Sequence, residues 1–590
     1  MLKRKSLSAD LCVVGGGMAG ICAAVAAARQ GIKVVLMHER AVLGGNASSE
    51  IRMWVCGARG TNNRETGIIE EIMLENLYRN PTKNYYIWDT VLYDFVIREE
   101  NITLLLNCTC MDAETESGNF SDGRDTKIRR ITGYQLTTQT FFDVEAKFYS
   151  DCSGDSILAP LTGAHFKIGR ECSSDYGEAT HVEHPDNFTM GMSCLLQGRQ
   201  TDKKIPFKAP EWSAKIKDNE VERRGTDIYN TLENFWYLEL GGNRNTIDDA
   251  EEITRDLMKL SVGMWDYIKN SGKMDADNWE LEFLGFLPGK RESRRMTGEY
   301  VITQKDISEN VIFDDTAAYG GWPLDDHFPL GFYHDGVPNT DFKTPAPYPL
   351  PYRALYSKNV ENLFFAGRNI SMTHMAMSSI RVMATCALLG QAVGTAAAIA
   401  AKYGLTPHGV YLKKTDELQQ ALMNSDCFLP YKKRNISSDC VKNAPYAELC
   451  DGMDRPNRTY GTKSCGIFAK NGAEIKYSSE QCFYAETVHI VFDSDLNRET
   501  LNGDFCERTH ATRCNILLDS PFMDMPKTLC KEFILTVTTE DGSESITHIT
   551  ENRKRGYDIQ IGKKVRSVSL IPVSNWGNTA ETAIFSFDFR

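Results

Sequence analysis

The sequence lacks a long apolar run, an excess of basic residues and any paired-cysteine motif. No stretch of about 18 or more apolar residues is free of breakers, so no membrane span is expected. Lys and Arg number 66 against 79 Asp and Glu, and the net charge of -13 disfavours a general partnership with nucleic acid or anionic membranes. A chain of 590 residues is too long for one hydrophobic core and indicates roughly two to four domains.

The cysteines show no metal or redox pattern. The chain holds 17 of them, an odd number at irregular intervals, and none forms a C-x-x-C pair or a spacing typical of zinc or iron–sulfur sites. We therefore predict reduced, mostly buried thiols in a cytoplasmic protein, and no metal site. The cysteines from Cys440 to Cys530 leave a disulfide pairing open in that region.

The N-terminal residues carry the pattern of a dinucleotide site. A short apolar strand, a glycine triplet and an alanine-rich helix follow one another, at Leu11–Val14, at Gly15, Gly17 and Gly20, and at Ile21–Arg29. The first glycine allows the tight turn, the second lets the backbone approach a pyrophosphate, and the third lets helix and strand pack closely. A second predicted strand leads to Glu39, whose carboxylate can accept hydrogen bonds from ribose hydroxyls.

A secretory signal is the alternative interpretation of this stretch. Lys3, Arg4 and Lys5 precede an apolar run that ends in small residues, as in such signals. Four glycines within the run, and the strand and acidic residue that follow it, argue against that alternative. We therefore predict a nucleotide site.

Three separate motifs resemble one family. The glycine triplet, the loop GGNASSEIRMW that begins at Gly44, and the segment NLFFAGR at 362–368 resemble the FAD-dependent oxidoreductases of the fumarate reductase and glutathione reductase type. More narrowly, they resemble a bacterial group of FAD-dependent oxidoreductases, over about residues 8 to 430. The resemblance implies FAD, because the late segment contacts the FAD phosphate and ribitol in that family and a protein that binds only NAD does not need it.

The same resemblance implies a set of cofactor residues. They are Gly15, Gly17, Met18, Ala19, Gly20, Glu39, Arg40, Gly44, Gly45, Asn46, Ala47, Ser48, Cys110, Gly154, Gly367 and Arg368. The stretch Asn46–Ser49 stands where the fumarate reductase pattern has a histidine for covalent flavin, so the FAD is expected to be non-covalent. That departure also weakens any transfer of a dicarboxylate substrate to this chain.

The fold class predicted is α/β, in three parts. A Rossmann-type FAD-binding domain is split between residues 1–164 and 356–436, and an inserted α+β substrate domain occupies residues 165–355. From 437 to 590 the chain is rich in short alternating strands with Asp, Asn and Gly turns, which favours a β-sandwich of jelly-roll type. This last part vaguely resembles the galactose-binding-like sandwiches of carbohydrate enzymes, and a structural or dimerisation role is an equal alternative.

Four residues are candidates for the chemistry. His374 lies in a loop that borders the flavin if the family geometry holds, and it could exchange a proton with substrate, or merely hydrogen-bond the loop. Arg381 could hold a substrate anion or stabilise negative charge on reduced flavin, or could only pack. Arg291 and Arg294 belong to a cationic run that could face a pocket and bind carboxylate or phosphate, or could be a solvated loop.

The leading hypothesis is an FAD-dependent oxidoreductase that moves a hydride between FAD and a small polar substrate, such as a carbohydrate or hydroxy acid. Cys56 has no partner cysteine at close spacing, so disulfide chemistry of the glutathione reductase kind is rejected. The alternatives are a non-redox hydratase or isomerase with structural FAD, and a carbohydrate-binding protein with a degenerate flavin domain. The electron acceptor and any homo-oligomer stay open.

Overall fold

A computed structural model describes residues 2–590 except 121–122, 181, 231–234, 462–464 and 499–510. Its centre is a seven-stranded sheet in the order β3-β2-β1-β6-β5-β4, with β18 pairing with β6. The parallel strands are β1 (Lys3–Val14), β2 (Val34–Met37), β3 (Ile102–Leu105), β6 (Thr140–Asp151) and β18 (Leu363–Phe365), while β4 (Cys108–Ser117) and β5 (Thr126–Gln135) continue antiparallel. The predicted Rossmann-type sheet is confirmed.

The first strand begins earlier than the apolar pattern indicates. Lys3 to Lys5 pair with β6 in parallel register, and only the last four residues of β1 are buried. The basic residues that suggested a signal sequence are therefore strand residues of the described sheet. The apolar pattern misses this part of the strand, because its first eight residues are exposed or half-buried and most are polar.

Two helices cross closely beside the nucleotide turn. In α1 (Met18–Arg29), 11 of 12 residues are buried, because the helix lies between the sheet and α10 (Met383–Tyr403). A Cβ atom on Gly390 would lie 2.0 Å from the Ala19 carbonyl oxygen, and one on Gly394 would lie 2.2 Å from that of Ala23. Glycine at both positions is therefore required for this crossing. Helix α10 is long and apolar enough to cross a membrane, but 94% of its apolar window is buried in this core.

The remaining helices are distributed over all three parts of the chain, and α12 packs against β20 of the C-terminal sheet. They are α2 (Ile68–Arg79), α3 (Tyr85–Ile97), α4 (Leu158–Thr162), α5 (Ser173–Tyr176), α6 (Asp218–Glu222), α7 (Ala250–Asn270), α8 (Gln304–Ser308), α9 (His374–Ile380), α11 (Pro407–Asn424) and α12 (Ser438–Asn443).

The inserted part consists of short strand pairs and one long helix. The strands are β7 (Phe166–Lys167) with β13 (Arg295–Met296), β8 (Met192–Ser193) with β10 (Glu239–Leu240) and β12 (Gly289–Lys290), β9 (Leu196–Gln200) with β11 (Trp279–Leu284), β14 (Thr316–Gly320) with β17 (Tyr348–Pro351), and β15 (Leu324–His327) with β16 (Asn339–Phe342). Helix α7 contributes Trp265 to a separate hydrophobic core of the inserted part, which also contains Trp279. Residues from Met296 to Tyr356 instead share the core of α1 and α10. The boundaries at 165 and 355 stay predictions.

The C-terminal part is an antiparallel sheet in the order β19-β24-β20-β23-β21-β22. Its strands are β19 (Ile467–Lys470), β20 (Ile475–Phe492), β21 (Cys530–Thr539), β22 (Glu544–Ile549), β23 (Gly556–Asn575) and β24 (Glu581–Phe589). The predicted β structure is present, but two stacked sheets of a sandwich are not confirmed. Strands β20 and β23, 18 and 20 residues long, hold the described strands in one continuous sheet.

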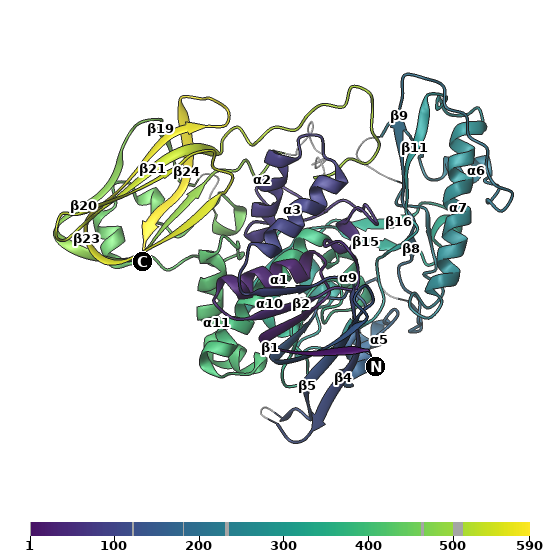
Figure 1. The fold of residues 1–590 in the computed structure, drawn as a ribbon, viewed down its shortest axis with the longest axis horizontal. Helices are drawn as coiled ribbons and strands as arrows, with labels where there is room; N and C mark the ends of the chain where they lie inside the picture. Colours follow the sequence, from purple (N-terminus) through teal and green to yellow (C-terminus); the bar gives the residue numbers. More distant parts are fainter. Residues whose placement is uncertain (1, 121–122, 181, 231–234, 462–464, 499–510) are drawn as a thin grey trace.

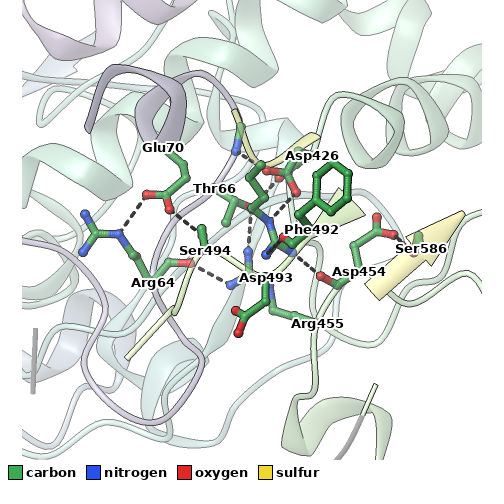
Figure 2. Close-up of polar contacts among 12 residues, drawn as sticks. Arg64, Thr66, Glu70, Asp426, Asp454, Arg455, Phe492, Asp493, Ser494 and Ser586 are labelled. Atoms are coloured by element: carbon green, nitrogen blue, oxygen red, sulfur yellow. Dashed lines mark hydrogen bonds and ion pairs between the residues drawn. The ribbon is translucent and has the colours of Figure 1, made fainter. Parts of the chain in front are cut away.

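A buried ion cluster fixes the C-terminal sheet to the FAD domain (Figure 2). Figure 2 shows Glu70 of α2 accepting hydrogen bonds from Arg64, at 2.9 Å, and from Ser494, at 2.7 Å. Glu70 also accepts from both terminal nitrogens of Arg498, at 2.8 and 2.9 Å. These cations hold the pKa of Glu70 well below its usual range, although burial alone would raise it. Because both partners are desolvated and matched, separating the two parts here would leave buried charges unpaired.

A second contact links the C-terminal part to the inserted part. A segment after β20 crosses above α2 and α3 in Figure 1. There the Ile516 N–H donates to the Gly198 carbonyl at 2.9 Å, and the Gln200 N–H donates to the Ile516 carbonyl at 2.8 Å. Cys514 is buried in a cluster with Trp54 and Val382. The C-terminal part therefore contacts both the part that contains the central sheet and the inserted part.

The cysteines agree with the reduced, buried state predicted. All 16 described cysteines are free thiols, and only Cys465 and Cys482 are partly exposed. Cys506 lies outside the described residues. No disulfide occurs among the described cysteines of the 440–530 region, so the pairing left open there is not supported.

Candidate functional site

A cavity of about 600 Å³ runs from the turn after β1 to the inserted strands β15 and β16. Two ends can be distinguished. The nucleotide end is lined by residues 15–19, 38–40, 44–46, 152–155 and 367–368. The outer end is lined by Trp54, Arg59, Trp236, Arg291, Trp322, Asp325, His327, Asn339, Asp341 and Arg381.

The glycines of the first turn each have a distinct role. A Cβ atom on Gly15 (φ 106°) would lie 2.3 Å from the Cys152 carbonyl oxygen, and one on Gly20 would lie 1.8 Å from that of Gly15. At Gly17 the nearest protein atom to such a Cβ would be 3.9 Å away. The protein itself thus requires the first and third glycines. The space at Gly17 is left to a ligand, and α1 begins there with no side-chain cap on its N–H groups.

His38, which the sequence reasoning missed, holds this turn in place. The Gly16 N–H donates to Nδ1 of His38 at 3.0 Å, and Nε2 lies 3.0 Å from the Val42 carbonyl oxygen. The acceptor role of Nδ1 requires the proton on Nε2. Burial and the nearby Arg40 lower the pKa of His38 to about 3, so the ring is neutral. The signal available in the sequence was that His38 directly precedes Glu39, at the end of the second predicted strand.

The loop after β2 lies against the glycine turn. The Gly44 N–H donates to the Gly16 carbonyl at 2.8 Å, and Gly44 and Gly45 have φ values of 109° and 61°. Arg40 buries Nε and Nη1 without a hydrogen bond, although Nη1 lies 3.4 Å from a carboxylate oxygen of Glu50 and Nε lies 3.8 Å from one of Glu39. Arg368 also buries its Nε without a hydrogen bond. Buried donors without partners are costly unless a ligand accepts from them. Together with the open space at Gly17, they fit a bound nucleotide pyrophosphate.

Most of the predicted cofactor residues line this end. These are Gly15, Gly17, Met18, Ala19, Glu39, Arg40, Gly44, Gly45, Asn46, Gly154, Gly367 and Arg368. Gly20, Ala47, Ser48 and Cys110 are not among the lining residues. Gly20 faces Gly15, the Ala47 carbonyl accepts from the Trp88 indole at 3.0 Å, Ser48 is fully buried, and Cys110 packs in the sheet core.

The predicted chemistry residues divide in two groups. Arg291 and Arg381 line the outer end, whereas Arg294 and His374 do not. The Arg294 guanidinium lies over the Phe166 ring and 3.4 Å from the Asp155 carbonyl oxygen. His374 is buried, with Nδ1 2.8 Å from Glu292 and Nε2 2.9 Å from Asp326.

His374 is therefore a charge-pairing residue behind the cavity wall. Burial alone would lower its pKa, but the carboxylates of Glu292 and Asp326 raise the pKa of His374 to about 10. Both ring nitrogens are occupied, which excludes direct proton exchange with a substrate in this arrangement. The predicted role in proton exchange does not fit this position, because the His374 ring is held beneath β15.

The histidine that lines the outer end of the cavity is His327, at the end of β15. Its Nδ1 lies 2.6 Å from Glu239, and its Nε2 lies 3.4 Å from Asp325. Burial would lower the pKa of His327, but Glu239 and Asp325 raise it. Sequence reasoning missed this residue, because β15 has no motif and Glu239 is 88 positions away. Asp325 and His327 are two positions apart, so their side chains lie on the same face of a strand. This spacing was the only local signal in the sequence.

The two acids that contact His327 each also pair with one arginine, Asp325 with Arg381 and Glu239 with Arg291. Nη2 of Arg381 donates to Asp325 Oδ2 at 3.1 Å, and its buried Nε has no hydrogen-bond partner. Arg291 donates to the Ser193 hydroxyl at 2.9 Å and lies 3.4 Å from Glu239. The outer end is thus a set of shared ion pairs.

Known proteins give one family match and several distant structural likenesses. Residues 10–422 match the family described as FAD dependent oxidoreductase. None of the curated proteins matches the chain. Solved structures that it is similar to include THI4 of Thermovibrio ammonificans (17% identity, 28% of this chain and 66% of that one, TM-score 0.21). Others are a geranylgeranyl bacteriochlorophyll reductase-like protein of Thermoplasma acidophilum (11%, 72% and 85%, 0.30) and a mutant of E. coli quinol fumarate reductase FrdA (11%, 71% and 75%, 0.28).

The family match covers well over half of the chain. The protein therefore belongs to the FAD dependent oxidoreductase family, and it is an enzyme that uses FAD. This confirms the family, the cofactor and the enzyme class predicted from the three motifs.

Proposed function

We propose that the protein transfers a hydride between a small polar substrate and non-covalent FAD in this cavity. The observation that carries the proposal is that a single cavity extends from the glycine turn at Gly17 to His327 and Arg381. FAD supplies the group that accepts or returns the hydride. Arg40, Arg368 and the first turn of α1 would hold its phosphates.

The first turn of α10 supports a charge-stabilising role at the boundary of the two ends. Val382 and Met383 line the cavity there, and no side chain caps the helix N–H groups. The positive end of a helix dipole stabilises a nearby anion by about 0.3–1 kcal/mol. Arg381 is ion-paired with Asp325 through Nη2, and its buried Nε–H has no hydrogen-bond acceptor, so this N–H can donate to a group at the boundary. This chain can therefore stabilise negative charge that develops in the cavity.

His327 is the proposed acid and base. Nδ1 is held closely by Glu239, whereas Nε2 is only loosely paired with Asp325, so Nε2 is the atom available to a substrate. For reduction of a carbonyl, the hydride reaches its carbon while Nε2–H gives a proton to its oxygen. For oxidation of the corresponding alcohol, neutral Nε2 takes the proton as the hydride leaves.

The test is spectroscopic. We expect purified protein to show flavin bands that are released as free FAD by acid, and to bleach anaerobically with a suitable alcohol substrate. The variant His327→Gln should keep the bound flavin and lose bleaching, whereas His548→Gln, on the exposed face of β22, should lose neither. Flavin that no substrate reduces would instead favour the hydratase or isomerase with structural FAD. Protein that cannot be loaded with FAD would contradict the proposal.

The proposed reaction also needs a second substrate that reoxidises the flavin. We further propose a cytoplasmic location, which is the prediction made from the cysteines. A homo-oligomer stays a prediction.

A further inference from the structure

We propose that the outer end binds an uncharged cyclic polyol, such as a sugar ring, and discriminates against carboxylates. The inference rests on the proposed function for the reaction but concerns binding alone. It comes from the charge pairing, the hydrogen-bond pattern and the aromatic walls of the outer end.

The three guanidinium groups of the outer end are matched one to one by three carboxylates, and His327 shares two of these carboxylates with them. Arg59 lies 3.7 Å from Asp341, and Arg381 lies 3.1 Å from Asp325. Glu239, just behind the wall, serves both Arg291 and His327. A site built to take a substrate carboxylate would need a cation whose charge is not already matched.

The strand pair β15–β16 presents a polar surface of alternating character. Asp325 stands opposite Asp341, and His327 stands opposite Asn339, in antiparallel register. All four side chains line the cavity. The Asn339 amide already donates to Asp325 at 2.5 Å, and Asp325 also accepts from Arg381 at 3.1 Å. The partners left to a ligand are the Asp341 carboxylate as acceptor and, as donors, the second amide N–H of Asn339 and the loosely paired Nε2 of His327. A hydroxyl group, which donates once and accepts twice, can match such a surface.

The same surface is unfavourable for an anion. A carboxylate that enters beside Asp325 and Asp341 meets two negative groups and must give up its hydration. The neighbouring arginines are held by those acids, so the field they add is largely cancelled. A neutral polyol meets no such repulsion.

Three tryptophans supply the other walls. Trp54, Trp236 and Trp322 all line the cavity, and the Arg59 guanidinium covers one face of Trp322 at 4.2 Å. Large indole surfaces bury the C–H face of a ring while the polar strand pair binds its hydroxyls. This combination of aromatic walls and paired charges favours a ring with both an apolar face and a hydroxylated edge.

Matched ligands test the inference on the unaltered holoprotein. Each neutral pyranose, such as galactose, glucose or mannose, is compared with its uronate, which differs only in a carboxylate at C6. Binding is measured anaerobically by calorimetry and by tryptophan fluorescence. We expect at least one neutral sugar to bind about tenfold or more tightly than its uronate, which corresponds to about 1.4 kcal/mol.

Two variants sharpen the test. Asp341→Asn leaves Arg59 without its carboxylate, so the preference for the neutral sugar should shrink by about tenfold and the uronate should gain affinity. Trp236→Leu should weaken the neutral sugar. Matched controls are Asp335→Asn and Trp212→Leu, whose side chains lie on the surface away from the cavity and should change neither affinity.

The outcomes separate the two proposals. Tighter binding of uronates or simple hydroxy acids, or no binding of any neutral sugar at millimolar concentration, would overturn the ligand class. An unchanged preference in Asp341→Asn would also count against it. Neutral sugars that bind but never bleach the flavin would contradict the hydride transfer and leave the ligand class standing.

Discussion

The two ends of the cavity are built in opposite ways. The nucleotide end is formed by backbone, mainly from one continuous stretch between residues 15 and 46, and its key positions are glycines that admit a ligand. The outer end is formed by side chains from distant segments, which hold one another through shared ion pairs. The first is therefore defined by local chain geometry, and the second by which segments the fold brings together.

The largest effect is expected at the third glycine of the turn. In Gly20→Ala the new Cβ would overlap the Gly15 carbonyl, which we expect to cost about 3 kcal/mol and to abolish recovery of flavin-loaded protein. The measurement is FAD content together with thermal unfolding. Gly17→Ala is the informative comparison, because its Cβ meets no close protein atom: it should fold normally and bind FAD more weakly. Equal FAD affinity in Gly17→Ala would show that no ligand approaches this position.

The next effect separates chemistry from cofactor binding. We expect His327→Gln to lower the rate of anaerobic flavin reduction about 100-fold or more, because it removes a general acid and base, while FAD affinity stays unchanged. Stopped-flow absorbance gives the rate and fluorescence titration gives the affinity. If His374→Gln lowers the rate as strongly with an unchanged pH profile, the assignment to His327 is wrong.

A third variant asks whether the C-terminal part supports only the outer end. Arg455, buried beside Phe428, donates to the carbonyls of Asn62 and Arg64 and so holds the loop that carries Arg59. Arg455→Gln should cost about 3 kcal/mol of unfolding free energy and weaken ligands of the outer end, with FAD affinity retained. Chemical unfolding and calorimetry measure these quantities. The exposed Arg566→Gln is the control, and equal loss of FAD affinity in Arg455→Gln would refute a separate support of the two ends.

The smallest effect is a pH dependence of opposite sign at the two ends. The pKa of His38 is lowered to about 3, so its contribution is present above the unfolded pKa near 6.5 and is lost as the pH falls from there towards 3. The pKa of His374 is raised to about 10, so its contribution is complete below about pH 6.5 and is lost as the pH rises through 10.

Unfolding free energies measured across pH test both signs. His38→Gln should flatten the acid side and His374→Gln the alkaline side, each by on the order of 1–2 kcal/mol. An alkaline side that His374→Gln leaves as steep as before would mean that its ion pairs with Glu292 and Asp326 contribute nothing.

Much of the nucleotide end could be predicted, because its signals lie close together in the sequence. The spacing of Gly15, Gly17 and Gly20 reports a turn, a ligand approach and a helix packing, each set by neighbouring backbone. Cys110 and Ser48 show the limit of a motif carried over residue by residue: both are buried near the site, and neither lines it.

The sequence by itself determined the family, the cofactor, the Rossmann-type sheet and the reduced cysteines, since these follow from local spacing and from composition. Only the tertiary structure decided which histidine reaches the outer end of the cavity. His374 had the better position in the motif, but α9 places it between Glu292 and Asp326, while β15 places His327 on the wall. Likewise, only the fold joined the C-terminal strands into one sheet and paired the charges of the outer end. Ion pairs form between segments up to hundreds of residues apart, and no local pattern encodes such distances.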